Sequence, residues 1–301
     1  LEALGEGLIM SPYIATVVLG GGFLRRADAG TQAKTIPALI EGRLQLAFAV
    51  EEYERVFSLE NTTLQGAVKG NDVVLNGTKA SVMNGDQADL LVVLVRTAGQ
   101  PGDKEGLSLF LVDANAEGIE RAPHRMVDGR QGAEIRFADV SVSQDACIGE
   151  LNKGYDVAKA VLQEGLLALS AESVGSMSVL LDDTVEYTKT RKQFGVPISK
   201  FQVLQFRMTD MFIAMEQTRS LLLASTLKYV EGHADADKAV HAMKAQLGRA
   251  GRKIGQEAIQ IHGGMGMTDE LGVGHFVKRL TAADGLFGNA DVHLRGMVKP
   301  A

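Results

Sequence analysis

The chain has 301 residues, 46% of them hydrophobic and 23% charged, with a net charge of −6. This is ordinary globular composition, long enough for two or three packed regions. Acidic and basic residues are interspersed, without a basic block or a lysine-rich amphipathic stretch, so neither nucleic acid nor a membrane is expected as a partner. The single cysteine, Cys147, excludes an internal disulfide and fits the reducing cytoplasm. Cysteine and histidine do not cluster at metal-ligand spacing, so we expect no metal.

Short helices are expected over residues 1–45, where apolar residues recur at helical spacing. A helix-like pattern is already running at Leu1, so we expect the chain to be cut inside a domain. The apolar run from Ile14 to Leu19 is too short to cross a bilayer and lacks a basic flank. It therefore predicts neither a transmembrane helix nor a signal peptide.

A β domain is expected from residue 46 to about residue 150, because the pattern changes there to β-branched and aromatic runs. The expected strands include Val73–Leu75, Leu90–Val95, Leu107–Val112 and Ile135–Phe137. The dipeptides Asn76-Gly77, Asn84-Gly85 and Asp128-Gly129 are interpreted as turns between strands. An antiparallel barrel or sandwich is the natural interpretation.

The chain is expected to be helical from Tyr155 onward. Three long segments carry apolar residues, several of them methionines, every three or four positions, which predicts a four-helix-bundle domain. The fold class is therefore α+β, mostly α. We expect three domains: residues 1–45, the remainder of an N-terminal helical domain; 46–150, the central β domain; and 151–301, the C-terminal bundle.

Chemistry is suggested first by the segment RKQFGVPISKFQ, residues 191–202. Gly195 and Pro197 predict a tight corner between two helices. Arg191 stands at the end of a helix, where a guanidinium can bind phosphate in a bidentate manner, and Phe194 on the corner can pack against a flat ring. Taken alone, the segment fits a plain helix corner with a surface arginine equally well.

The second segment is QIHGGMGMTDE, residues 260–270, at the end of the third long helix. Glycines at 263, 264 and 266 allow a backbone to approach a ligand closely, and their amides can donate to phosphate oxygens. Taken alone, the segment could equally be a helix cap followed by a flexible turn.

Together, the two segments resemble those of the acyl-CoA dehydrogenase family, and the likeness covers essentially the whole chain. The stretches VVLGGGFLRR, TRKQFGVPI and TDELGVGHFVKRLT are most similar to the small-subunit type called pimeloyl-CoA dehydrogenase. About 80 N-terminal residues usual in the family are expected to be missing. The resemblance implies helical–β–helical subunits, usually in tetramers, that bind FAD. They oxidise an acyl-CoA to the 2,3-enoyl-CoA, and electron-transfer flavoprotein accepts the electrons.

In the family, each FAD lies between two subunits, and the neighbouring subunit contributes the R-x-x-F-G segment and the Q-I-x-G-G turn. By resemblance, six residues here correspond to that contribution, and we call them the contributed half-site. They are Arg191, Phe194, Gln202, Gln260, Gly263 and Gly264. All six are present.

The subunit that holds the flavin ring contributes other motifs, and here these have changed. The family's E-P-x-x-G-S-D stretch corresponds to EEYERVFS, residues 51–58, without the proline, glycine and aspartate. The family's K-x-W-I-T-N-G corresponds to KASVMNG, residues 79–85. Ser81 replaces the ring-contacting tryptophan and Met83 replaces the threonine. A serine offers no stacking face, and a thioether offers no donor.

The positions that correspond by resemblance to the family's catalytic base are also changed. One family position corresponds to Phe287, which cannot abstract a proton, and the alternative family position corresponds to Gly165. Glu164 is adjacent, but one step along a helix turns a side chain by about 100°. Glu164 is therefore a weak candidate, and a solvated helix carboxylate is the more natural interpretation.

The intact motifs are those given to a neighbour, and the changed motifs are those used for the chain's own flavin. This pattern predicts a subunit that completes the FAD site of a catalytic partner in an α2β2-like dimer of dimers. A homo-oligomeric dehydrogenase of acyl-CoA remains open. So do a flavin-dependent oxidase or monooxygenase of the same fold and a scaffold subunit without enzymatic activity.

Overall fold

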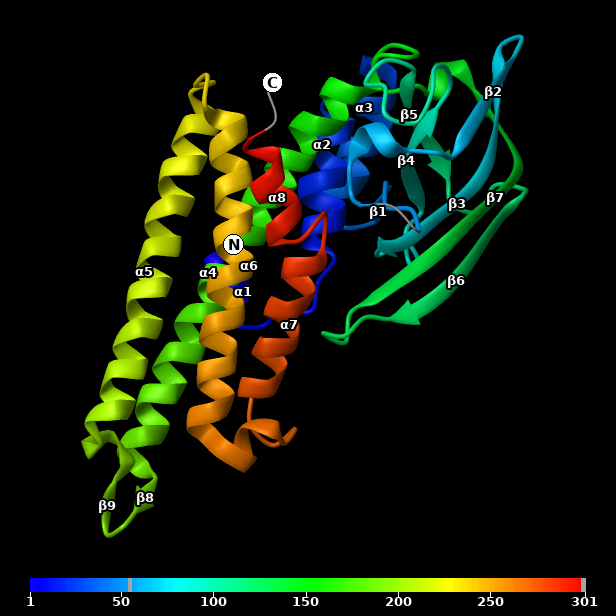
Figure 1. The fold of residues 1–301 in the computed structure, drawn as a ribbon. Helices are drawn as coiled ribbons and strands as arrows, with labels where there is room; N and C mark the ends of the chain where they lie inside the picture. The colour runs from blue at the N-terminus through cyan, green and yellow to red at the C-terminus, as the bar shows by residue number, and fades with distance from the viewer. Residues whose placement is uncertain (54–55, 299–301) are drawn as a thin grey trace. The chain divides into compact units, whose positions relative to one another are not determined.

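The computed structural model describes residues 1–53 and 56–298. They form two compact units (Figure 1). One unit comprises residues 11–165 and contains the sheet, and the other comprises residues 1–10 together with the chain from residue 166 onward. The division into three domains along the sequence stays a prediction. Glu54 and Arg55, part of the changed EEYERVFS stretch, lie outside the described residues.

The sheet unit is built on seven strands in the order β1-β4-β2-β3-β7-β6, with β5 paired to β4. Their bounds are β1 Leu46–Ala49, β2 Gln65–Lys69, β3 Asp72–Met83, β4 Leu90–Arg96, β5 Leu107–Asp113, β6 Ile119–Arg125 and β7 Gln131–Ser143. Most pairs are antiparallel, whereas β1 and β2 pair with β4 in parallel. Inward-facing aliphatic and aromatic side chains, including Val73, Leu91 and Phe110, are fully buried in one core.

The expected turn at Asn76-Gly77 is wrong. Both residues lie inside β3, at a shift of register against β7. The Asn76 side chain bonds Asp139 on β7 through both its amide nitrogen and its oxygen, each at 2.9 Å. Gly77 has a φ of +140°. An asparagine–glycine pair therefore forms a β-bulge here instead of a hairpin turn. The turns at Asn84-Gly85 and Asp128-Gly129 are confirmed.

Short helices precede the sheet in the same unit. They are the π-helix Ile14–Gly20, α2 Gly21–Leu24 and α3 Ala29–Ile40. Thr16 fixes the π-helix to β1, because its hydroxyl donates to the Leu46 carbonyl at 3.1 Å and accepts from the Leu46 amide at 3.2 Å. Helix α4 Gly154–Thr190 is divided between the units: its residues up to Gly165 belong to this unit, and those from Leu166 onward belong to the helical unit.

The helical unit is a bundle, which with the sheet confirms the mostly helical α+β class. Its helices are α1 Glu2–Glu6, the rest of α4, α5 Gln202–Val230, α6 Ala236–His262, α7 Val273–Gly285 and α8 Ala290–Gly296. The methionines at helical spacing, such as Met177, Met211 and Met243, are fully buried, as expected of core residues. A buried ion pair joins α4 to α7, with Arg279 Nε 2.8 Å from Glu172 Oε1.

One helix among the described residues, α4, is long and apolar enough to cross a bilayer by length and composition. However, 78% of its most apolar stretch is buried inside the protein. Burial of that kind is also found in core helices, so α4 is weak evidence for a membrane span.

Candidate functional site

The first segment of the contributed half-site is a hairpin between α4 and α5. Strands β8 Lys192–Gln193 and β9 Val196–Pro197 pair, and the Ile198 amide donates to the Arg191 carbonyl at 2.9 Å. Phe194 and Gly195 at its tip both have positive φ, +54° and +80°. This is the geometry of a two-residue hairpin turn, and it is strained for a phenylalanine.

The side chains of this hairpin face outward. Phe194 is 92% exposed, which is unusual for a large aromatic residue. Arg191 is exposed, and its guanidinium has no protein partner within residues 1–53 and 56–298. Gln202, the first residue of α5, is exposed as well. An aromatic face and a cation are therefore held outside the bundle by a short, rigid corner.

The second segment is the glycine turn after α6. Gly263 ends the helix with φ +62° and ψ −140°, a conformation closed to most L-residues. A side chain added at Gly263 or Gly264 would meet no atom within 4 Å, so their backbone lies open on that side. Gly266 differs, because an added Cβ would lie 3.0 Å from the Ile259 carbonyl oxygen. Gln260 is exposed on the last turn of α6.

The structure brings these two segments together. Tyr187, on the last turns of α4, stacks on His262 with ring centroids 4.3 Å apart. Tyr187 stands one helical turn before Arg191, and His262 immediately precedes Gly263. The geometry fits the pyrophosphate and ring edge of FAD, since an open glycine backbone, an exposed guanidinium and an exposed aromatic face lie at one end of the bundle.

The chain's own ring-binding segments do not fit a flavin ring in the family manner. Ser81 sits at a register shift of β3 with a φ of +43°, and its hydroxyl lies 3.3 Å from Nε2 of His124. Met83, at the end of β3, is half-buried. Of the two positions that contact the ring in the family, one therefore carries a small hydroxyl close to a histidine, and the other carries a thioether.

The changed stretch after β1 is fastened by a buried ion pair that sequence reasoning missed. Lys79 Nζ, fully buried, lies 2.7 Å from Oε1 of Glu52. Glu52 also accepts from the amides of Thr63 and Leu64. Burial alone would raise the pKa of Glu52, but the charge of Lys79 and these hydrogen bonds hold it below its ordinary value.

At the expected base positions 164 and 165, neighbouring side chains pack closely. At Gly165, an added Cβ would lie 2.5 Å from Cδ2 of Leu19, so a side chain there requires the buried Leu19 side chain to shift. The carboxylate of Glu164 is held between two guanidiniums, with Arg25 and Arg26 each at 2.8 Å. Glu164 is thus a structural ion-pair partner in the geometry seen here, and a proton acceptor there would have to break two contacts.

The close contact at Gly165 gives a direct prediction. Gly165→Ala is expected to lower the free energy of unfolding by about 1–2 kcal/mol, despite the better helix propensity of alanine, since the methyl group must displace Leu19. Urea denaturation measures this. Gly285→Ala is the control, because its added Cβ would meet no atom within 4 Å. Stabilisation by Gly165→Ala equal to that of the control would contradict the close packing.

Phe287 is buried on the loop between α7 and α8, with a φ of +57°. Its carbonyl accepts from Nε2 of His293 at 2.9 Å, and buried Lys244 donates to the carbonyls of Asp284 and Gly288 at 2.8 and 2.9 Å. The left-handed backbone at position 287 is therefore fixed by hydrogen bonds, although the side chain there is not a base.

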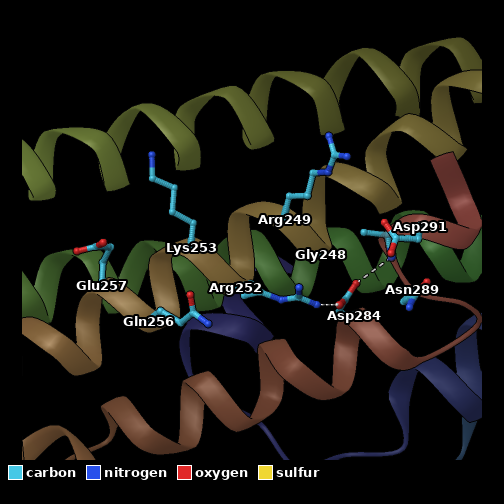
Figure 2. Close-up of a pocket in the computed structure, with 10 residues that line it drawn as sticks. Gly248, Arg249, Arg252, Lys253, Gln256, Glu257, Asp284, Asn289 and Asp291 are labelled. Carbon is cyan, nitrogen blue, oxygen red and sulfur yellow. Dashed lines mark hydrogen bonds and ion pairs between the residues drawn. The ribbon is translucent and has the colours of Figure 1, made fainter.

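The outer side of this loop borders a pocket of about 320 Å³ beside α6 (Figure 2). Asp284 accepts from Arg252 at 3.1 Å and from the Ala290 amide at 3.1 Å. Arg249 and Lys253 of α6 also line the pocket. The pocket contains no residue of the contributed half-site, and its lining carries both positive and negative charges. We therefore infer that Asp284 and Arg252 hold the loop before α8 in place.

Burial of His293 predicts a pH dependence of stability. Its pKa is lowered to about 3 by desolvation, with the nearby charges of Lys244 and His241 acting in the same direction. The unfolded chain binds this proton near pH 6.5 and the folded chain does not, so stability falls as pH drops below 6.5. The loss at pH 5 is about 2 kcal/mol. His293→Gln should flatten this fall in pH-dependent urea denaturation, and an unchanged slope would contradict it.

Two models of known families match the chain. "Acyl-CoA dehydrogenase, middle domain" matches residues 48–140, and "Acyl-CoA dehydrogenase, C-terminal domain" matches residues 152–300. Among curated relatives, the 3-(aryl)acrylate reductase of Clostridium sporogenes is 30% identical, over 83% of this chain and 66% of its own length. The caffeyl-CoA reductase-Etf complex subunit CarC of Acetobacterium woodii is 30% identical, over 88% and 71%. The chain thus spans about two thirds of the length of these relatives.

Solved structures agree. The ChsE4-ChsE5 complex from Mycobacterium tuberculosis contains a chain with a TM-score of 0.89 and 25% identity, covering 100% of this chain and 79% of that one. The FAD complex of PigA has a TM-score of 0.91 and 27% identity, covering 98% and 79%. Sequence models, relatives and structures converge, and the chain belongs to the acyl-CoA dehydrogenase family.

Proposed function

We propose that this chain is a subunit of an FAD-dependent acyl-CoA dehydrogenase, in which its contributed half-site completes the FAD site of a partner chain. The reaction is α,β-dehydrogenation of an acyl-CoA thioester. The observation that carries the proposal is the contrast between an open, exposed contributed half-site and ring-binding positions occupied by Ser81 and Met83.

The residues of the contributed half-site have distinct roles in this proposal. Arg191 binds the pyrophosphate in a bidentate manner, which its exposed guanidinium permits. The backbone of the turn at Gly263 and Gly264 lets the phosphates approach closely, since no side chain blocks it, while the Gly263 amide itself donates to the carbonyls of Ile259 and Gln260. Phe194 covers an apolar part of the cofactor, which explains a strained and 92% exposed phenylalanine.

The partner chain supplies the acyl-CoA site and the base. Phe287 and Gly165 cannot accept a proton, and Glu164 is engaged by Arg25 and Arg26. FAD, when bound, accepts the hydride that leaves the β carbon of the acyl group. In this proposal, a carboxylate of the partner chain removes the proton from the α carbon.

An α2β2 assembly, a dimer of dimers, is the arrangement proposed. The likeness to a chain of the two-component ChsE4-ChsE5 complex supports it. Electron-transfer flavoprotein is proposed as the acceptor, supported by a relative named as a subunit of an Etf complex. A cytoplasmic location also stays a prediction, from the single cysteine.

Flavin stoichiometry tests this assembly. The chain and its partner, purified together, are expected to contain one FAD for every two chains, because the ring-binding motifs of this chain are changed. Flavin absorbance near ~450 nm against total protein measures the ratio. One FAD per chain in a homo-oligomer of this chain alone would contradict the proposal.

A different flavin reaction is the second candidate, favoured by the likeness to PigA, one of whose structures holds FAD and proline. It would not require a base for an acyl-CoA thioester. Oxygen consumption and peroxide release by the purified assembly discriminate between the two. Rapid oxygen turnover without any activity on acyl-CoA would favour this candidate.

A further inference from the structure

The contact between Tyr187 and His262 joins the ends of α4 and α6, which lead into the two segments of the contributed half-site. Tyr187 lies on α4, four residues before Arg191, and the Arg191 amide donates to the Tyr187 carbonyl at 2.8 Å. His262 is the last residue of α6 and is 5% exposed. The two rings stack with centroids 4.3 Å apart and planes 27° from parallel.

The tyrosine hydroxyl adds a directional contact to this stack. It donates to the His262 carbonyl oxygen at 3.3 Å. Carbonyls in the last turn of a helix have no partner within their own helix, so Tyr187 of α4 caps the end of α6. The carbonyl it holds belongs to the peptide that leads into Gly263, and its orientation sets the direction of the glycine turn.

His262 itself is fixed from the other side. Its Nδ1 donates to the Ala258 carbonyl oxygen at 2.8 Å, which orients the ring on α6. The side chain of Tyr187 therefore lies against a ring that cannot rotate freely. The contact therefore ties the peptide before Gly263 to α4, one helical turn before Arg191.

We propose that Tyr187 is a positioning residue for FAD, which sets the distance between the Arg191 guanidinium and the backbone of the glycine turn. This inference rests on the proposed function and deepens it. Binding of one pyrophosphate by both segments requires them to be held at a fixed separation before the ligand arrives. A stacked ring with one hydroxyl hydrogen bond supplies that constraint.

Tyr187→Phe is the sharpest test, because it keeps the ring and removes only the hydroxyl. In the purified assembly with its partner chain, the dissociation constant for FAD is expected to rise roughly three- to tenfold, the range for one lost hydrogen bond. Amide hydrogen exchange over residues 263–268 should become faster in the variant, while α5 exchanges as before. Tyr187→Leu, which also removes the stack, should have a larger effect on both measurements.

Two matched variants separate positioning from general stability. Tyr229→Phe removes a tyrosine hydroxyl from the far end of α5 and should leave FAD affinity unchanged. His262→Phe keeps a ring for Tyr187 to stack on and keeps the carbonyl, so it should retain FAD better than His262→Ala.

The outcomes also distinguish the inference from the function on which it rests. Loss of FAD in Arg191→Ala, with wild-type affinity and wild-type exchange in Tyr187→Phe, would overturn the positioning role alone. Unchanged FAD affinity in Arg191→Ala would overturn the proposed half-site and the positioning role together. Weaker FAD binding and faster turn exchange in Tyr187→Phe, with Tyr229→Phe unaffected, is the result we expect.

Discussion

Replacing Arg191 with alanine is expected to weaken FAD binding to the assembly of this chain and its partner by roughly 10- to 100-fold. The range follows from the loss of a charged, bidentate hydrogen-bonding group from a phosphate. Arg191→Lys should fall between wild type and alanine, because it keeps the charge and loses the planar fork. Flavin retention through gel filtration, with a fluorescence titration of FAD, measures both variants.

The matched control is Arg249→Ala, which removes an exposed arginine from α6 in the same unit. It changes the net charge equally, so it should retain FAD like wild type. Equal loss of flavin in both variants would show that overall charge matters more than the position of Arg191. Equal retention in both would contradict a role for Arg191 in binding the cofactor.

Replacing Lys79 with methionine is expected to have the largest effect on stability, lowering the free energy of unfolding by about 3–5 kcal/mol. The Lys79 side chain is fully buried, and its removal leaves the Glu52 carboxylate, itself 8% exposed, without its cation. The double variant Lys79→Met with Glu52→Gln should recover part of the loss, since no unpaired charge then remains.

Lys153→Met serves as the control for Lys79→Met. Lys153 pairs with Glu150 at the surface, where both side chains are more than two-thirds exposed. Loss of that pair should change stability by no more than about 1 kcal/mol. Denaturant unfolding of the three variants compares them directly. A loss for Lys79→Met as small as for Lys153→Met would contradict a role of the buried pair in fastening the stretch after β1.

Much of the fold was predictable from local pattern. The runs at Leu90–Val95 and Leu107–Val112 became β4 and β5, because β-branched residues bounded by turn residues rarely form anything else. The Asn76-Gly77 turn was wrong, since only the pairing of Asn76 with Asp139, 63 residues away, decides that the chain continues as a strand. Long-range hydrogen bonds of this kind leave no trace in a local window.

The candidate site was predictable where a motif carries its own geometry. Arg191, Phe194 and the glycines at 263 and 264 were identified from their spacing and a family resemblance, and the structure places them at one end of the bundle. Tyr187 and His262 were missed, because they contact one another across 75 residues. The available signal was their position, one turn before Arg191 and one residue before Gly263.

Only the structure explains in physical terms why the positions of the family's base, Gly165 and the adjacent Glu164, do not supply a base. The sequence showed that Gly165 lacks a base, but not that the Leu19 side chain packs against this position. The sequence left Glu164 open, whereas Arg25 and Arg26 engage both of its carboxylate oxygens. These contacts join residues far apart in the chain, so neither could be derived from spacing along one helix.

The most direct test of the central claim compares this chain alone with the same chain purified beside a dehydrogenase-like partner that has complete ring-binding motifs. Flavin absorbance and dye-coupled oxidation of acyl-CoA are measured for both preparations. We expect little flavin and no activity for the chain alone, whereas the pair should contain flavin and oxidise acyl-CoA. Full flavin content and acyl-CoA oxidation by the chain alone would contradict it.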